Sequence, residues 1–208
     1  MGGLTAWPPG APSLWLPAAA GALALAALLA AALVRRARTA ERRRIRRALR
    51  RLSLDVIEDA LVPDGVGGTR HIDRLLLTRR GVLALDLRPY PGKLFGAERI
   101  EYWTQVTRGG SFRFANPLPE VRLTLQVLRP LLPGVPLQGR VVFTGEGWFA
   151  GEAPPGVSRL ETLERDLGPL AGGEPPAGCR QAWDAFRERL RAVAEADAGA
   201  GTRAGLAP

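Results

Sequence analysis

Two apolar runs separated by a short turn constrain the fold more than any other feature of this sequence. The runs are IDRLLLT (72–78) and VLALDLR (82–88), with Arg-Arg-Gly between them. Short apolar segments joined tightly at a glycine are typical of buried strands in an antiparallel hairpin. We therefore expect two paired strands, each with an acidic residue near the end away from the turn.

The length of the turn decides which residues face each other. If residues 79 and 80 alone form the loop, the register places Asp73 directly opposite Asp86, whereas a loop that also includes Gly81 places Asp73 opposite Leu87. Opposed residues share a face with Cβ atoms about 5 Å apart, where two anions repel by roughly 3 kcal/mol at an effective dielectric constant near 20. The shorter loop therefore predicts a cation between the two carboxylates.

The net charge of +9 comes from one short segment. Residues 1–34 have no charged side chain, and residues 35–51 hold ten arginines and one glutamate. The rest of the chain holds 19 of the 29 basic residues and 19 of the 20 acidic residues, so its net charge is zero. A domain that binds DNA through its surface normally spreads basic residues over the fold. The composition therefore gives little support to a basic DNA-binding domain.

Several classes of site are excluded by residue counts. The single cysteine, Cys179, rules out an internal disulfide and a multi-cysteine metal site. The single histidine, His71, removes the two-histidine zinc motifs and argues against a histidine-based triad. Neither a phosphate-binding loop nor a dinucleotide-binding glycine motif occurs in the sequence.

The segment 14–34 has the length and composition of a transmembrane helix. Its 21 residues have no charge and would extend about 31 Å as a helix, enough for a hydrocarbon core of about 30 Å. The segment RRAR follows immediately, and positive charge of this kind stays on the cytoplasmic side. A cleaved signal peptide would need a basic start, which residues 1–13 lack. We expect an inner-membrane protein with residues 1–13 outside and the domain in the cytoplasm.

The Arg-rich segment 35–52 is predicted to be a juxtamembrane helix. Ile45, Leu49, Leu52 and Val56 recur at helical spacing, which indicates an apolar stripe packed on the domain and an arginine face in solvent. Arginines beside a membrane also attract anionic lipid, at about 1 kcal/mol per residue. Contact with nucleic-acid phosphates is a further alternative.

The remaining segments predict an α/β domain. We expect a strand at 55–63, a short strand at 92–96, a hairpin over 99–116, a helix over 117–132, a strand at 140–145, a short helix at 159–167, a C-terminal helix at 178–196 and a loose tail over 197–208. The pattern predicts one central sheet with helices on its faces.

Residues 71–96 resemble a known family. The stretch HIDRLLLTRRGVLALDLRPYPGKLFG, with a tryptophan at 103 and NPLPE at 116–120, is similar to the nuclease-related domain (NERD) family over about residues 41–145. The resemblance implies a domain over 41–170 with a restriction-endonuclease-like mixed sheet flanked by helices. In that fold an Asp, an acid two residues before a Lys, and often a Glu on the first helix hold a divalent metal.

The family pattern carries over only in part. Asp73 stands where the family has its Asp, but the family's Glu-Thr-Lys is Asp86, Leu87 and Arg88 in this chain. Glu120 replaces the glutamine of the NPLxQ segment, and Glu41 lies one residue before the position of the first-helix glutamate. The resemblance thus implies Asp73 and Asp86 as ligands of Mg²⁺ or Mn²⁺, with Arg88 in place of the lysine.

Arg88 makes two interpretations of the site possible. A complete site would hydrolyse phosphodiesters, because the metal polarises the phosphate and activates a water molecule. Arginine cannot act as a base, but its guanidinium can pair with Asp86 or Asp73 and replace the metal as a structural counter-ion. Lys93 is a candidate for the missing base from a displaced position. His71 is a candidate ligand or an ordinary polar side chain.

From the sequence we favour a membrane-anchored protein with a nuclease-like fold and a degenerate site that has no metal cofactor. One alternative is an active nuclease that depends on Mg²⁺ or Mn²⁺. A second alternative is a membrane-tethered module that binds lipid or protein through residues 35–51 and has no nucleic-acid function. Glu101 is expected to be an ordinary solvated acid.

Overall fold

The computed structural model describes residues 15–65, 67–168 and 174–204, without the side chains of residues 15–24, 194 and 196–204. The chain divides into two compact units, Met1–Arg43 and Arg44–Pro208.

The first unit consists of most of a long helix, α1 (Trp15–Leu52). The sequence predicted two elements here, but no glycine or proline interrupts residues 22–52, and the alanine, leucine and arginine that dominate them are strong helix formers. Leu25, Leu28, Leu29, Leu33 and Val34 are exposed. In the part of the chain that the structure describes, no helix is long and apolar enough to cross a membrane, so the predicted transmembrane helix is not supported. Residues 1–13 lie outside the described residues.

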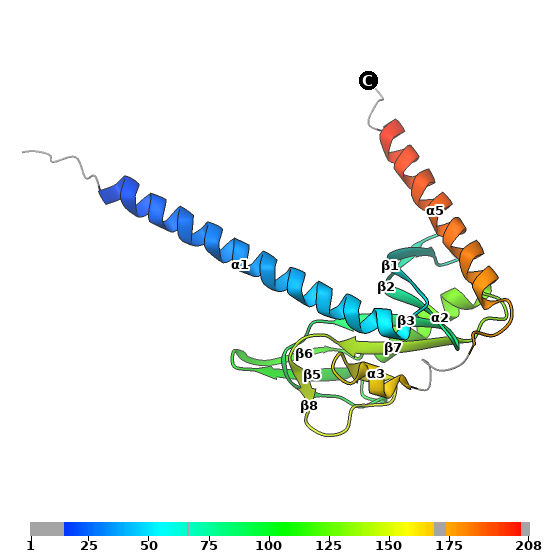
Figure 1. Cartoon of the computed structure of the whole chain (residues 1–208). Helices are drawn as coiled ribbons and strands as arrows, with labels where there is room; N and C mark the ends of the chain where they lie inside the picture. The colour runs from blue at the N-terminus through cyan, green and yellow to red at the C-terminus, as the bar shows by residue number, and fades with distance from the viewer. Residues whose placement is uncertain (1–14, 66, 169–173, 205–208) are drawn as a thin grey trace, which may run out of the picture. The chain divides into compact units, whose positions relative to one another are not determined.

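The larger sheet of the second unit contains the predicted hairpin. Its strands are β1 (Asp55–Pro63), β2 (Thr69–Thr78), β3 (Gly81–Arg88), β7 (Leu137–Phe143) and β9 (Val157–Arg159), in the order β1-β2-β3-β7-β9. The first three strands are antiparallel, whereas β7 runs parallel to both β3 and β9. The prediction of a mixed sheet is therefore confirmed (Figure 1).

A second sheet was not predicted. It consists of β4 (Gly92–Phe95), β5 (Tyr102–Thr107), β6 (Gly110–Ala115) and β8 (Gly147–Phe149), in the order β6-β5-β4-β8. Pro89 and Pro91 follow β3 directly, and proline has no N–H group with which to continue a ladder. The chain therefore leaves the first sheet after Arg88 and begins another.

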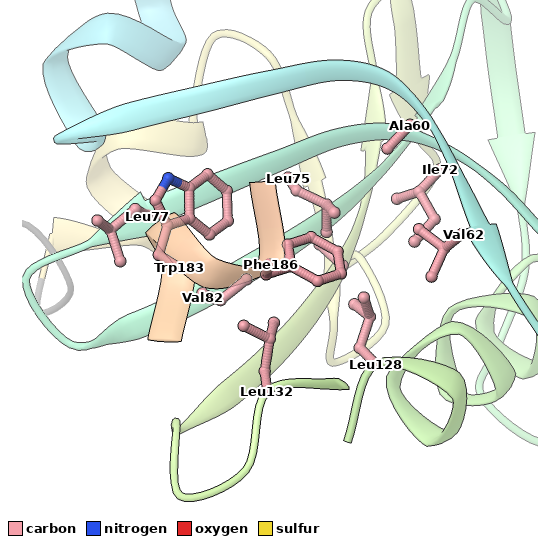
Figure 2. Close-up of a cluster of buried hydrophobic side chains, with 11 residues drawn as sticks. Ala60, Val62, Ile72, Leu75, Leu77, Val82, Leu128, Leu132, Trp183 and Phe186 are labelled. Carbon is pink, nitrogen blue, oxygen red and sulfur yellow. The ribbon is translucent and has the colours of Figure 1, made fainter. Parts of the chain in front are cut away.

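Helices cover both faces of the larger sheet. On one face, Trp183 and Phe186 of α5 (Cys179–Ala204) and Leu128 of α2 (Leu118–Leu131) pack against β-strand residues such as Leu75 and Val82 (Figure 2). On the other face lie the last turns of α1, which begin the second unit, and α3 (Leu163–Asp166). The predicted α/β class with flanking helices is confirmed.

The apolar stripe after the Arg-rich run is confirmed in part. Ile45, Leu49 and Leu52 are buried in the core beneath the larger sheet. Val56 packs against the same cluster, but it does so from β1, because α1 ends at Leu52.

The strand predicted at 140–145 is β7, which begins three residues earlier, and the bounds of two helices also differ from the prediction. Helix α5 continues to Ala204, past the predicted end at residue 196, and residues 197–204 include three alanines, which favour a helix, and no proline, which would end it. Residues 205–208 lie outside the described residues. The predicted short helix over 159–167 is reduced to α3, because residues 157–159 pair with β7 as strand β9.

The second sheet is fixed to the domain by the residues of the family motif. The ring of Trp103 lies so close to Gly96 that a Cβ atom there would be 2.3 Å from it. Asn116 donates from Nδ2 to the carbonyl oxygens of Glu98 and Ile100, and its Oδ1 accepts from the N–H of Leu118 at the start of α2. These motif residues are therefore structural.

Candidate functional site

The register of the hairpin follows from its turn. Strands β2 and β3 pair from Thr78 and Gly81 to Arg74 and Leu85, which confirms the two-residue loop. Gly81 has φ +122°, and a Cβ atom there would lie 2.2 Å from the carbonyl oxygen of Pro136. Glycine at this position therefore fixes the length of the turn.

One step beyond the last pair, the two strands carry Asp73 and Asp86. Here the regular ladder stops, and Oδ2 of Asp73 accepts a hydrogen bond of 2.6 Å from the backbone N–H of Leu87. The carboxylate of Asp73 thus satisfies a backbone donor of β3. This contact ties Asp73 to the strand that carries Asp86.

Asp86 is paired with Arg88 on the same strand. Nη2 of Arg88 donates to Oδ2 of Asp86 across 2.7 Å, and Nε lies 2.7 Å from Oδ1 without the geometry of a hydrogen bond. The side chains of Asp86 and Arg88 are 18% and 32% exposed. Both carboxylate oxygens of Asp86 therefore face a guanidinium group.

Burial determines the electrostatics of this pair. It raises the pKa of Asp86 above the usual value; the contact with Arg88 opposes this rise, and the charges of Asp73 and Glu120 add to it. Burial by itself would lower the pKa of Arg88, but the hydrogen bond and the charge of Asp86 outweigh this effect and raise it. Arg88 is therefore a permanent cation beside a carboxylate that is costly to ionise.

Three further residues lie near Asp73. His71 is half exposed, with Nδ1 3.6 Å from Oδ1 of Asp73 and Nε2 3.6 Å from Oδ1 of Asp59. Asp59 also contacts Arg74 at 3.2 Å. Sequence reasoning missed Asp59, which has φ +51°, a conformation that aspartate tolerates better than most residues. Asp59 lies within a run of residues that predicts a regular strand, so the sequence did not indicate its unusual backbone conformation or its contacts with His71 and Arg74.

The site opens onto a small cavity. Its volume is about 90 Å³, enough for a few water molecules. Helix α2 closes it from above the sheet through Val121 and Thr124. The cavity is lined by these two residues with His71, Ile72, Asp73, Ala84, Leu85 and Asp86. It is too small for a nucleotide.

The other candidate residues have different surroundings. Glu120 lies in the first turn of α2 and pairs with Arg70 of β2 at 2.9 Å. Lys93 is in the second sheet, and its Nζ lies 5.0 and 5.2 Å from the rings of Phe95 and Trp148. Lys93, the candidate for the missing base, therefore contacts these two rings.

The two remaining acidic candidates are Glu41 and Glu101. Glu41 lies on α1 within the first unit, whereas Asp73 and Asp86 belong to the second unit. Glu101 is exposed before β5, and its carbonyl oxygen accepts a hydrogen bond from the backbone N–H of Asn116.

The arrangement does not fit a divalent metal. Mg²⁺ requires about six oxygen ligands in a regular octahedron, and Mn²⁺ favours the same oxygen donors. One oxygen of Asp73 is used by the N–H of Leu87, and both oxygens of Asp86 face Arg88. Within residues 15–65, 67–168 and 174–204, no three His, Cys, Asp or Glu side chains are placed to hold a metal ion. A metal would have to displace Arg88.

Comparisons with known proteins give one match. No curated protein and no solved structure matches the chain. The model of the nuclease-related domain family matches residues 36–144, which is more than half of the chain and includes both acids, Arg88 and the motif around Asn116. The chain belongs to the nuclease-related domain (NERD) family.

Proposed function

We propose that this domain is a non-catalytic member of the family, a nuclease-like fold that binds nucleic acid without cleaving it. The observation that supports this proposal is the contact between Arg88 and Asp86. Arg88 supplies within the chain the positive charge that a metal ion would bring to the site.

The chemistry of arginine separates this role from catalysis. A guanidinium group stays protonated at every relevant pH, so it cannot take a proton from an attacking water. A divalent ion can bind the phosphate and also lower the pKa of a bound water molecule. A guanidinium group is not a metal centre and cannot activate a water in this way. The charge of Asp86 is balanced by Arg88, and Asp73 accepts a hydrogen bond from the N–H of Leu87. On this proposal the site therefore lacks both a base and a metal-activated nucleophile.

The main alternative is an active nuclease. It is favoured by the placement of Asp73 and Asp86 on the two strands of one hairpin, where both line the same cavity. For this alternative, Arg88 must swing away from Asp86 when a metal ion binds. The two proposals therefore differ in the affinity of the site for Mn²⁺.

Calorimetric titration of the full-length protein with Mn²⁺ tests the proposal. We expect weak or no binding by the wild type and tighter binding by Arg88→Lys, since lysine is a compact charge that can lose its proton. Glu98→Gln is the control, because Glu98 pairs with Arg122 on an exposed surface. Tight binding by the wild type, together with DNA cleavage that Asp73→Asn abolishes, would show that the domain is a nuclease.

The Arg-rich segment is not wholly available to lipid or nucleic acid. Within the second unit, Arg44 contacts Glu161, Arg46 lies 3.4 Å from Glu58 and Arg51 lies 3.4 Å from Glu164. Exposed ion pairs of this kind contribute about 0–1 kcal/mol each, so a polyanion can compete for these arginines. An interaction module that binds anionic lipid through residues 35–51 therefore stays a second proposal.

The location of the protein also stays a proposal. It rests on the uncharged sequence of residues 14–34 and on the RRAR that follows, which together favour an inner-membrane protein with its domain in the cytoplasm. Fractionation of the full chain tests it. Recovery in the membrane pellet after a carbonate wash is expected, and recovery in the wash would contradict the anchor.

A further inference from the structure

The second sheet has one face in the core and one face toward solvent. Leu94, Trp103, Phe114 and Phe149 belong to or pack against the core cluster of this part of the domain. Because side chains alternate across a strand, their neighbours in sequence point the other way. This outward side, which carries the exposed rings of Phe95, Tyr102 and Trp148, is the aromatic face.

The aromatic face combines large rings with positive charge. Phe95, Tyr102 and Trp148 are 43%, 46% and 46% exposed. Their companions at outward positions of the four strands include two cations, Lys93 and Arg113, and no acid. The outward positions are Lys93, Phe95, Tyr102, Thr104, Val106, Ser111, Arg113, Ala115 and Trp148.

The strand register places the three rings on one diagonal. Trp148 of β8 pairs with Lys93 of β4, two residues before Phe95, and Phe95 pairs with Thr104 of β5, two residues from Tyr102. Each step thus moves by one strand and two residues, which is about 4.8 Å by about 6.8 Å, or about 8 Å along the diagonal. The rings are too far apart to stack on one another.

Each cation lies against a ring. Nζ of Lys93 is 5.0 Å from the ring centre of Phe95 and 5.2 Å from that of Trp148. Cζ of Arg113 is 4.9 Å from the ring centre of Tyr102. Every ring therefore has a positive charge beside it, and the inward core is complete without these rings.

We propose that the aromatic face binds single-stranded nucleic acid, with one base on each ring and the phosphates near Lys93 and Arg113. Aromatic side chains on a sheet surface stack unpaired bases, and neighbouring cations attract the backbone. The spacing of about 8 Å exceeds the 3.4 Å between stacked bases, so the bases would be splayed apart. A duplex hides the base faces that the rings would contact.

This inference deepens the proposed function by naming its ligand, but it does not depend on Asp73, Asp86 or Arg88. The assay contains no metal ion. Tight Mn²⁺ binding by the wild type would therefore overturn the non-catalytic proposal and leave the ligand of the aromatic face unaffected.

The test must separate contacts to bases from the general attraction of the Arg-rich segment for polyanions. Fluorescence anisotropy of the full-length protein is measured with labelled oligo-dT of about 12 nucleotides and with an abasic strand of the same length. The ratio of the two affinities reports the bases alone. We expect the wild type to bind oligo-dT at least tenfold more tightly than the abasic strand.

Substitutions on the aromatic face should remove this preference. Phe95→Ala, Tyr102→Ala and Trp148→Ala are each expected to reduce the preference by about fivefold or more, and Trp148→Phe should retain most of it. Phe112→Ala is the matched control, because Phe112 is an exposed ring on the same sheet at an inward position. Lys93→Gln and Arg113→Gln should weaken binding of both strands and lower its salt dependence.

Three outcomes would overturn the proposal. One is equal affinity of the wild type for oligo-dT and the abasic strand. Another is equal loss in Phe112→Ala and in the variants of the aromatic face. The third is a preference for anionic vesicles that the same three substitutions abolish, which would assign the face to a membrane surface.

Discussion

Arg88 donates from Nη2 to Oδ2 of Asp86 across 2.7 Å, and both side chains project from the same face of β3 because they are two residues apart. A lysine at this position would reach the site as a mobile point charge, whereas the planar guanidinium lies along the carboxylate. The pair closes the site from within the strand. The first prediction follows from its burial.

Arg88→Ala is expected to destabilise the domain by about 1–3 kcal/mol, because it leaves the half-buried carboxylate of Asp86 without its counter-ion. The double variant Asp86→Ala/Arg88→Ala should be less destabilised than Arg88→Ala alone. Urea unfolding at neutral pH measures both. Arg122→Ala removes an exposed ion pair with Glu98 and should cost no more than about 1 kcal/mol. An equal loss in the Arg122 and Arg88 variants would show that the buried pair has no special role.

The loss of unfolding free energy in Arg88→Ala should also depend on pH. Burial raises the pKa of Asp86 above 3.8, and the contact with Arg88 opposes that rise. Removing Arg88 therefore raises the pKa of Asp86 further. A group whose pKa is raised on folding stabilises the fold when protonated, and this contribution is lost as the pH rises through its folded pKa. The destabilisation should be largest near neutral pH and should shrink as the pH falls toward 4.

Urea midpoints at several pH values check this dependence. The difference between wild type and Arg88→Ala should narrow with acidification, whereas the double variant with Asp86→Ala should show no such narrowing. A difference that stays constant from neutral pH to pH 4 would mean that Asp86 is already free to ionise in the folded domain.

The structural role of Asp73 gives a prediction that separates hydrogen bonding from charge. Asp73→Ala removes the acceptor for the N–H of Leu87 and should destabilise the domain by about 1–2 kcal/mol. Asp73→Asn keeps an acceptor oxygen and should cost less than half as much. Thermal unfolding of the two variants gives the comparison. Equal losses would indicate that the negative charge, and not the hydrogen bond, matters at this position.

The sequence predicts the local parts of this architecture well. The two-residue loop and the buried stripe of Ile45, Leu49 and Leu52 follow from turn chemistry and periodicity, which are properties of neighbouring residues. The predicted pairing of Asp73 with Asp86 is not part of the ladder, which ends at Arg74 and Leu85. The position of Lys93 could not be predicted in this way, because it depends on β4 joining a separate sheet beside β8. Parallel pairing between strands far apart in the chain leaves no local signal.

The same limit applies to charges. The arginines of residues 35–51 appear in the sequence as a solvated face, yet Arg44, Arg46 and Arg51 meet glutamates of the domain. Two of those partners, Glu161 and Glu164, lie more than 100 residues away in the chain. Periodicity identifies which face of a helix is polar, but it cannot identify the partners of that face.

The docking of α5 onto the larger sheet gives the last prediction. Asp55 accepts hydrogen bonds from Nε1 of Trp183 and from the N–H of Val56, and it contacts Arg187. Burial by itself would raise the pKa of Asp55, but these hydrogen bonds and the charge of Arg187 outweigh it and lower the pKa below 3.8.

A group whose pKa is lowered on folding stabilises the fold above its unfolded pKa, and this contribution is lost as the pH falls through the folded pKa. Asp55→Asn should therefore cost about 1–2 kcal/mol at pH 7, and the difference from wild type should narrow below pH 4. Urea unfolding at pH 7 and in steps below pH 4 measures it. Asp59→Asn, an exposed aspartate on the same strand, is the control and should cost less at pH 7. A loss in Asp55→Asn that persists unchanged in acid would mean that shape, and not ionisation, holds α5 in place.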